Sequence, residues 1–143
     1  MSDECWKWSA CDTATAIAEH RVSCREVMES VVERVRSTNR EVNAIVDDLT
    51  EAALEKARAL DSSPGSAPYG PLHGVPVTVK ENVDQKGYAT PNGVAGFKDI
   101  IAPDDSPVVK NLLDAGAIVV GRTNTPEFSF RAFTDNPLHG PTL

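Results

Sequence analysis

The stretch between residues 75 and 121 constrains the fold of this 143-residue chain more than any other part of the sequence. Two β-branched, apolar runs, residues 75–80 and 117–121, predict strands. Between them, residues 106–113 carry a capping serine, a proline at the first helical position and apolar residues at helical spacing, and Gly116 follows as a stop signal. A strand, a helix and a second strand in this order are typical of a parallel sheet covered by helices. We therefore expect an α/β fold.

The first 62 residues are predicted to be mainly helical. Residues 23–36 place their apolar side chains along one stripe of a helix, and Ser23 with Glu26 forms the signature of a capping box at its start. A shorter helix is expected over residues 14–18, where alanine and isoleucine recur at helical spacing. Two amphipathic helices therefore precede the strands.

Further elements follow from local signals. Thr50 can cap a third helix that extends to residue 60, and the turn-forming residues 61–66 predict a loop after it. The apolar run 43–47 is as compatible with a helix end as with a buried strand, and we assign it as a strand. Residues 125–133 begin with a cap, a proline and a glutamate, and these predict a short helix.

The composition is that of a globular protein. Hydrophobic residues make up 41% and charged residues 24% of the sequence, which argues against disorder. The net charge of −7 disfavours binding to a phosphate backbone, so no nucleic-acid partner is expected. The longest apolar run, residues 115–121, is far shorter than the roughly 20 residues that cross a bilayer, so no membrane association is expected. The acidic start lacks the features of a secretory signal, and we expect a cytoplasmic location.

Neither a metal nor a cofactor is expected. The cysteines Cys5, Cys11 and Cys24 are odd in number and lack metal-ligand spacing, so reduced thiols are the expected state. No second histidine follows His20 at zinc-finger spacing. The glycines of residues 70–74 match neither the dinucleotide-binding nor the P-loop pattern.

Lys80 is the residue that fits its surroundings least, because it ends an apolar strand and precedes the polar residues Glu81, Asn82 and Asp84. A lysine drawn into apolar surroundings loses the hydration of its ammonium group and can then act as a base near neutral pH. The alternative is a lysine that reaches solvent at the strand end and pairs with Glu81 or Asp84. The residues alone leave both interpretations open.

Other candidate side chains carry weaker signals. His20, His73 and His139 could act as bases, but a single histidine in a turn is more often structural. Ser129 lies in a Phe-Ser-Phe run, where packing is the expected role, and no serine stands in a G-x-S-x-G pattern. The residues alone therefore reveal no nucleophile.

Three stretches resemble the amidase signature family, which comprises serine hydrolases that cleave amide bonds. The run Gly-Pro-Leu-His-Gly-Val-Pro-Val-Thr-Val-Lys-Glu-Asn at residues 70–82 looks like the opening motif of that family. Residues 104–128, which end in Gly-Arg-Thr-Asn-Thr-Pro-Glu-Phe, are similar to the segment that follows it, and the paired helices of residues 13–38 resemble the family's N-terminus. The resemblance covers nearly all of the chain. It implies N-terminal helices packed on the first strands of a mixed, largely parallel sheet.

The resemblance also implies a mechanism. In the family, a lysine acts with two serines, and the proton of the nucleophilic serine passes through a bridging serine to the lysine. The matching lysine is Lys80, and we expect Asn82 and Asn124 to support the site. The implied substrate is a small-molecule amide, and the implied reaction needs no cofactor.

The sequence departs from the family in one respect. The family's two serine-bearing stretches, one like Gly-Gly-Ser-Ser-Gly-Gly and one like Gly-Ser-Asp-Thr-Gly-Gly-Ser, are not found in these residues. We therefore expect residues 1–143 to be the N-terminal part of one amidase domain, incomplete as a catalyst, with a helical region over 1–62 and the start of the α/β core over 63–143. We expect this part alone to lack amide hydrolysis. The alternative is a non-catalytic fragment that binds a separately encoded remainder of an amidase.

Overall fold

The computed structural model describes residues 4–62 and 70–143. Within these ranges the chain forms four α-helices and three strands: α1 (Ala10–Ala18), α2 (Cys24–Val42), β1 (Ile45–Asp48), α3 (Thr50–Ser62), β2 (Pro76–Lys80), α4 (Pro107–Asp114) and β3 (Ile118–Thr123). Each element lies close to the position predicted from the sequence. Residues 63–66 of the predicted loop lie outside the described residues.

The start of α2 shows why local sequence signals suffice for this helix. Ser23 Oγ accepts a hydrogen bond from the Glu26 backbone N–H at 3.1 Å, and the Glu26 carboxylate accepts one from the Ser23 N–H at 2.9 Å. The carboxylate of Asp61, at the end of α3, accepts hydrogen bonds from the backbone N–H groups of Cys24 and Arg25, both at 2.9 Å. Side-chain oxygens thus satisfy the first-turn donors that no helical carbonyl can reach. The predicted capping box is confirmed.

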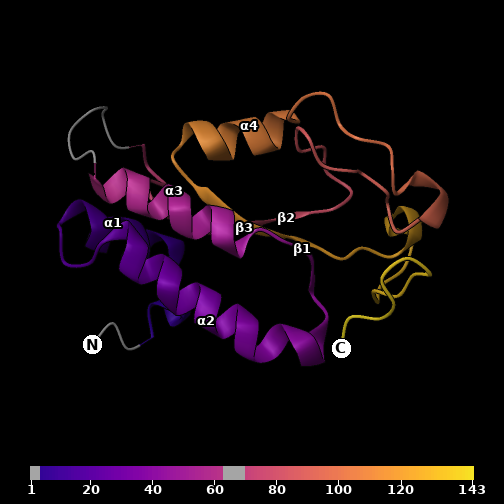
Figure 1. Cartoon of the computed structure of the whole chain (residues 1–143), viewed down its shortest axis with the longest axis horizontal. Helices are drawn as coiled ribbons and strands as arrows, with labels where there is room; N and C mark the ends of the chain where they lie inside the picture. The colour runs from indigo at the N-terminus through magenta and orange to yellow at the C-terminus, as the bar shows by residue number, and fades with distance from the viewer. Residues whose placement is uncertain (1–3, 63–69) are drawn as a thin grey trace.

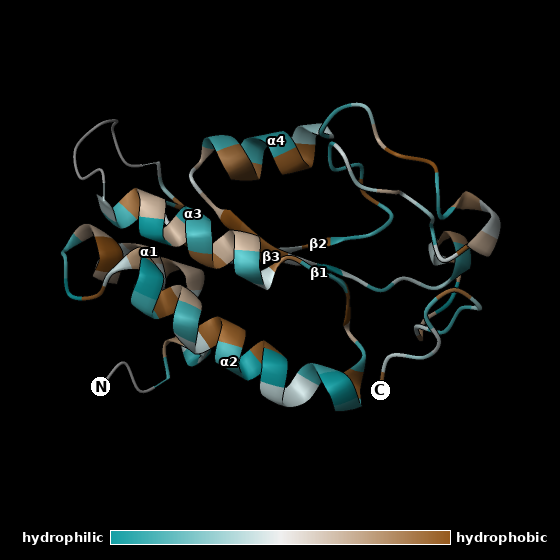
Figure 2. Cartoon of the chain, viewed as in Figure 1, coloured by the Kyte–Doolittle hydropathy of each residue, from teal (hydrophilic) through white to brown (hydrophobic). Residues whose placement is uncertain are grey.

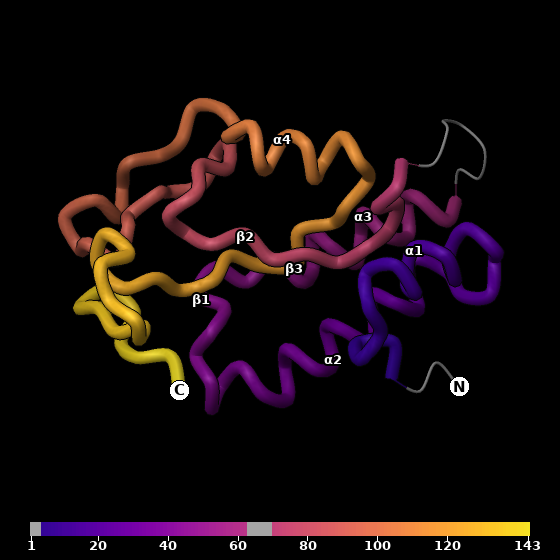
Figure 3. Tube along the Cα trace, turned by 180° about the vertical axis from the view of Figure 1, so that it is seen from behind, coloured from indigo at the N-terminus to yellow at the C-terminus, as the bar shows by residue number. Residues whose placement is uncertain are grey.

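The three strands form one mixed sheet in the order β1-β3-β2. β2 runs parallel to β3, and β1 runs antiparallel to β3. A parallel pair needs a crossover connection, and α4 lies in that connection. Figure 1, and Figure 3 from behind, show α4 on one side of the strands and α2 on the other. The α/β fold and its strand–helix–strand unit are confirmed.

The main core lies between α2, α3 and β3. Figure 2 shows hydrophobic and hydrophilic residues alternating along α2, as expected for a helix that buries one stripe. The buried residues of this core include Val27, Met28, Val32, Ala53, Ala57, Ile118 and Val120. Burying one large apolar side chain contributes about 1.5–3 kcal/mol, so this cluster is what holds the helices on the sheet.

The short helix predicted for residues 125–133 is wrong in extent. The structure has a single 3₁₀ turn, Glu127–Ser129, in which Phe128 and Ser129 have positive φ angles of 50° and 59°. Left-handed backbone cannot continue a right-handed helix. In addition, the Phe128 N–H donates to the carbonyl of the distant Asn92 at 2.9 Å. A tertiary contact therefore overrides the local capping signals.

Candidate active site

Polar residues follow the two parallel strands at the same edge of the sheet. β2 ends at Lys80 and β3 ends at Thr123, and these two residues are register partners. Asn124 and Thr125 follow β3, and both are buried. In open α/β sheets, ligands bind beyond the carboxyl ends of the parallel strands. This edge is therefore the candidate site.

The hydroxyl group of Ser129 brings side chains together at this edge. Its Oγ accepts a hydrogen bond from Lys80 Nζ at 3.4 Å and another from Asn82 Nδ2 at 3.0 Å. Thr125 Oγ1 lies 3.0 Å from the same oxygen. Two of the predicted site residues, Lys80 and Asn82, thus converge on one atom. Asn124 joins this group indirectly, because its Oδ1 accepts the hydrogen bond of the Thr125 N–H at 3.0 Å.

The environment of Lys80 agrees with one half of the alternative interpretation, because its amine reaches solvent at the strand end, but the ion pair of that interpretation is not formed within the part of the chain that the structure describes. Its side chain is exposed, although Val79 before it is buried, because successive side chains of a strand point to opposite faces. The apolar surroundings considered for this lysine are therefore not observed in the structure. Within the described residues Lys80 also forms no ion pair with Glu81 or Asp84. Its amine faces solvent at the candidate edge, with the Ser129 hydroxyl as its neighbour.

The packing role expected for Ser129 is wrong. Its side chain is exposed, and its hydroxyl takes part in three polar contacts. The positive φ of this residue interrupts the helix in which it would have packed. The sequence signal that could have located it is indirect: it follows the end of a strand parallel to the one that ends in Lys80.

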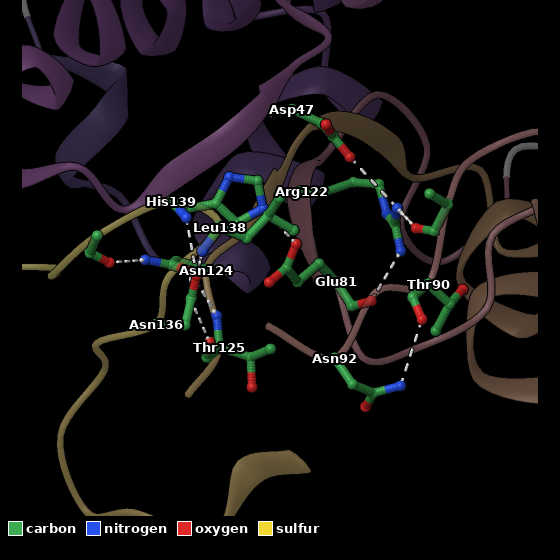
Figure 4. Close-up of polar contacts among 12 residues, drawn as sticks. Asp47, Glu81, Thr90, Asn92, Arg122, Asn124, Thr125, Asn136, Leu138 and His139 are labelled. Carbon is green, nitrogen blue, oxygen red and sulfur yellow. Dashed lines mark hydrogen bonds and ion pairs between the residues drawn. The ribbon is translucent and has the colours of Figure 1, made fainter. Parts of the chain in front are cut away.

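Asn124 organises the last residues of the sequence. Its Nδ2 donates to the Gly140 carbonyl at 3.0 Å and to Thr142 Oγ1 at 3.1 Å. Asn136 Nδ2 in turn donates to Asn124 Oδ1 and to the Thr125 carbonyl, both at 2.7 Å. Figure 4 shows these amide side chains turned toward one another. They anchor residues 134–143 against the end of β3.

A buried carboxylate lies immediately after Lys80. The Glu81 side chain is 1% exposed, and its Oε2 lies 2.8 Å from His139 Nε2 (Figure 4). Burial raises the pKa of Glu81, and the contact with His139 opposes this effect. This contact ties the end of β2 to the segment that Asn124 anchors. It is consistent with a structural role for His139.

Arg122 supports the same edge from inside the sheet, a role that was not predicted from the sequence. Its side chain is fully buried and donates to the carbonyls of Glu81 at 3.2 Å, Val83 at 3.0 Å and Ala89. Its Nη1 also lies 3.3 Å from the Asp47 carboxylate. An arginine within an otherwise apolar strand is the sequence signal that could have found it, because a buried charge requires partners. Arg122 therefore holds the loop after Lys80 in place.

The described residues contain no group of three or more His, Cys, Asp or Glu side chains arranged to bind a metal ion. None of the helices in the same residues combines the length and the apolarity that crossing a bilayer requires.

Comparison with known proteins identifies the family. The family model described as Amidase matches residues 26–143. The chain belongs to the amidase signature family. The resemblance of the motifs at residues 70–82 and 104–128 is thereby confirmed.

Two of its relatives are amide hydrolases by name. The chain is 55% identical over 139 residues to an indoleacetamide hydrolase of Bradyrhizobium diazoefficiens, covering 96% of this chain and 26% of that enzyme. It is 36% identical over 147 residues to an acylamidase of Rhodococcus erythropolis, covering 99% of this chain and 30% of that enzyme. The chain thus spans between a quarter and a third of the length of these amidases.

Solved structures of this family share the fold. A fatty acid amide hydrolase superimposes with a TM-score of 0.87 at 26% identity, covering 96% of this chain and 25% of that chain. A bacterial aryl acylamidase of the amidase signature family gives a TM-score of 0.85 at 30% identity, covering 94% of this chain and 29% of that chain. The mixed sheet and its helices are therefore part of the amidase signature fold.

Proposed function

We propose that this chain supplies the general base, Lys80, of an amidase that hydrolyses carbon–nitrogen amide bonds. The observation that carries the proposal is the position of Lys80, in the family's opening motif and at the carboxyl end of β2, with its amine exposed and 3.4 Å from a serine hydroxyl. Within the described residues no carboxylate forms an ion pair with this amine. A neutral amine at this edge is a competent acceptor for a hydroxyl proton.

The proposed chemistry is acyl transfer through a serine. Lys80 accepts the proton of a serine hydroxyl by way of a second serine, and the hydroxyl oxygen attacks the amide carbonyl carbon. The carbon–nitrogen bond breaks, the nitrogen leaves with a proton returned along the same path, and water then hydrolyses the acyl-enzyme. Both serines belong to the family stretches that these residues lack, so we propose that residues 1–143 alone do not hydrolyse amides. Asn82 and Asn124 support the site.

The proposed substrate is a small primary arylacetamide. This follows the indoleacetamide hydrolase of Bradyrhizobium diazoefficiens, to which the chain is 55% identical. We propose a cytoplasmic location because no disulfide joins Cys5, Cys11 and Cys24 in the described residues.

A second candidate function is association with a remaining amidase segment, with residues 1–143 as the N-terminal part of the domain. The observation that favours it is a group of exposed aromatic rings near Ser129. Phe130 is 88% exposed, and the rings of Phe97 and Phe128 are in edge contact at 6.1 Å between centroids. Exposed apolar groups of this kind favour a covering partner.

The test is a chimera in which residues 1–143 replace the matched part of the Bradyrhizobium diazoefficiens indoleacetamide hydrolase. We expect the chimera to release ammonia from indole-3-acetamide, and we expect Lys80→Met to abolish that release. Lys110→Met is the matched control, because Lys110 is an exposed lysine on α4 that pairs with Asp114. Full activity of the Lys80→Met chimera would refute the assignment of the base.

The second measurement is amide hydrolysis by residues 1–143 alone and by the same residues mixed with the part of that enzyme that they do not match. We expect no turnover from the chain alone. Comigration and restored turnover of the mixture would support association. Turnover by the isolated chain that Lys80→Met removes would contradict the proposed inactivity.

A further inference from the structure

We propose that Ser129 is a positioning residue that holds the Lys80 side chain at the candidate edge. This inference rests on the proposed role of Lys80 as the base. Its support is the pattern of donors and acceptors around one oxygen, together with an unusual backbone conformation at the same residue.

The donors around Ser129 determine the direction of its hydroxyl hydrogen. A serine hydroxyl has two acceptor lone pairs and one hydrogen. An amide NH2 group and a lysine ammonium group only donate, so Asn82 Nδ2 and the ammonium form of Lys80 occupy the two lone pairs. The hydrogen is then left for Thr125 Oγ1, 3.0 Å away, and Thr125 donates its own hydrogen to the Pro126 carbonyl at 3.3 Å. This chain of hydrogen bonds aims a lone pair of Ser129 at Lys80.

With Lys80 in its ammonium form, this pattern is not that of a nucleophilic serine. A nucleophilic serine must donate its hydrogen toward the base. Here the hydrogen points to Thr125, which is fully buried. Ser129 therefore accepts from Lys80 and acts on the reaction through Lys80.

The backbone supports a special role for this position. Phe128 and Ser129 are consecutive non-glycine residues in left-handed conformation, with φ angles of 50° and 59°. Such strained conformations persist only where the surroundings enforce them, and they cluster at functional sites. Here the bond from the Phe128 N–H to the Asn92 carbonyl, at 2.9 Å, is one of the contacts that hold the turn. The turn places the Ser129 hydroxyl at the end of β2.

Two substitutions separate the hydroxyl from the backbone. Ser129→Ala and Ser129→Gly both remove the hydroxyl, but only glycine relaxes the left-handed conformation. Ser37→Ala is the matched control, since Ser37 is an exposed serine of α2 whose hydroxyl makes one bond, to the Arg34 carbonyl. An effect of the hydroxyl must be the same in both Ser129 variants and absent from the control.

The first readout is the order of the Lys80 ammonium group, measured by ¹⁵N relaxation in the 143-residue chain. We expect Lys80 to be more ordered than the exposed Lys98, and we expect both Ser129 variants to lower its order to the level of Lys98. An unchanged order in either variant would overturn the proposal. So would a loss of order in the Ser37→Ala control.

The second readout is the activity of the chimera. Because Ser129 acts through Lys80, we expect both variants to lower kcat about tenfold or more and to leave KM within about twofold. A loss confined to KM would overturn the positioning role, because it would mean contact with substrate. The two proposals can fail separately. If the Lys80→Met chimera keeps full activity, Lys80 is not the base. If the Ser129 variants still lower the order of the Lys80 ammonium group in that case, the contact between Ser129 and Lys80 stands.

Discussion

Replacing Arg122 by leucine should remove the support of the loop that carries the candidate site. The buried guanidinium donates to the carbonyls of Glu81, Val83 and Ala89 and lies against the Asp47 carboxylate. A buried acceptor that loses its partner costs about 1–3 kcal/mol. The Glu81 carbonyl bond is buried and the other two are partly buried, so we take about 2 kcal/mol for the first and about 1 for each of the others. The sum is about 4 kcal/mol.

Urea unfolding of the chain, followed by circular dichroism, measures this loss. With a slope of about 2 kcal/mol per molar urea, the midpoint of Arg122→Leu should fall by about 2 M. Arg122→Lys keeps the charge but loses the forked geometry, so we expect about half of that shift. If the leucine variant does not fold, the urea midpoint of Arg122→Lys still tests the prediction.

Arg21→Leu is the control for this experiment. Arg21 pairs with Glu19, and both side chains are more than half exposed. Such surface pairs contribute about 0–1 kcal/mol, so the midpoint should barely move. The reasoning is refuted if the urea midpoint of Arg122→Leu lies as close to the midpoint of the unsubstituted chain as the midpoint of Arg21→Leu does.

Two further predictions concern stability. Ser23→Ala breaks the capping box and should cost about 1 kcal/mol at pH 7 in urea unfolding. The backbone N–H of Ser23, and after it the Ser23 hydroxyl, hold the pKa of Glu26 below its usual 4.5. The substitution removes only the hydroxyl's part of this effect, so its cost should be largest above that pH and should shrink, without vanishing, as the pH falls through the lowered value. A cost that grows as the pH falls would contradict this. Gly116→Ala adds a Cβ at a φ of +93°, only 2.9 Å from His73 Cα, and should cost about 2 kcal/mol or more in thermal unfolding. An unchanged melting temperature would show that the backbone relaxes freely there.

The elements that the sequence predicted well are those whose signals are local. The capping box of Ser23 and Glu26 requires only residues three apart, and the structure contains both of its bonds. The start of α4 likewise needs only Ser106 and Pro107, and Ser106 Oγ accepts from the Val109 N–H. Periodicity and caps therefore sufficed for α1 to α4, and β-branched runs sufficed for β2 and β3. The caps at residues 125–126 did not suffice, because the contact with Asn92 imposes a 3₁₀ turn there.

The candidate site was predictable only in part, because its contacts join distant residues. The motif identified Lys80 and Asn82, which converge in the structure. Ser129 is 49 residues from Lys80 in the sequence, and its place depends on a left-handed turn that a Phe-Ser-Phe run does not signal. Arg122 escaped notice for a similar reason, since its partners lie on a loop 33 to 41 residues away.

The surroundings of the Lys80 amine depend on where the side chain of its neighbour Glu81 lies. Glu81 is adjacent in sequence and was the obvious ion-pair partner, yet its carboxylate is turned into the interior and bonded to His139. His139 reaches it because Asn43 and Asn124 anchor the segment around Gly140. The exposed amine is thus left with a hydroxyl rather than a carboxylate. Since His139 holds the Glu81 carboxylate in the interior, the docking of this distant segment determines that the Lys80 amine is exposed beside Ser129 and is not paired with its sequence neighbour.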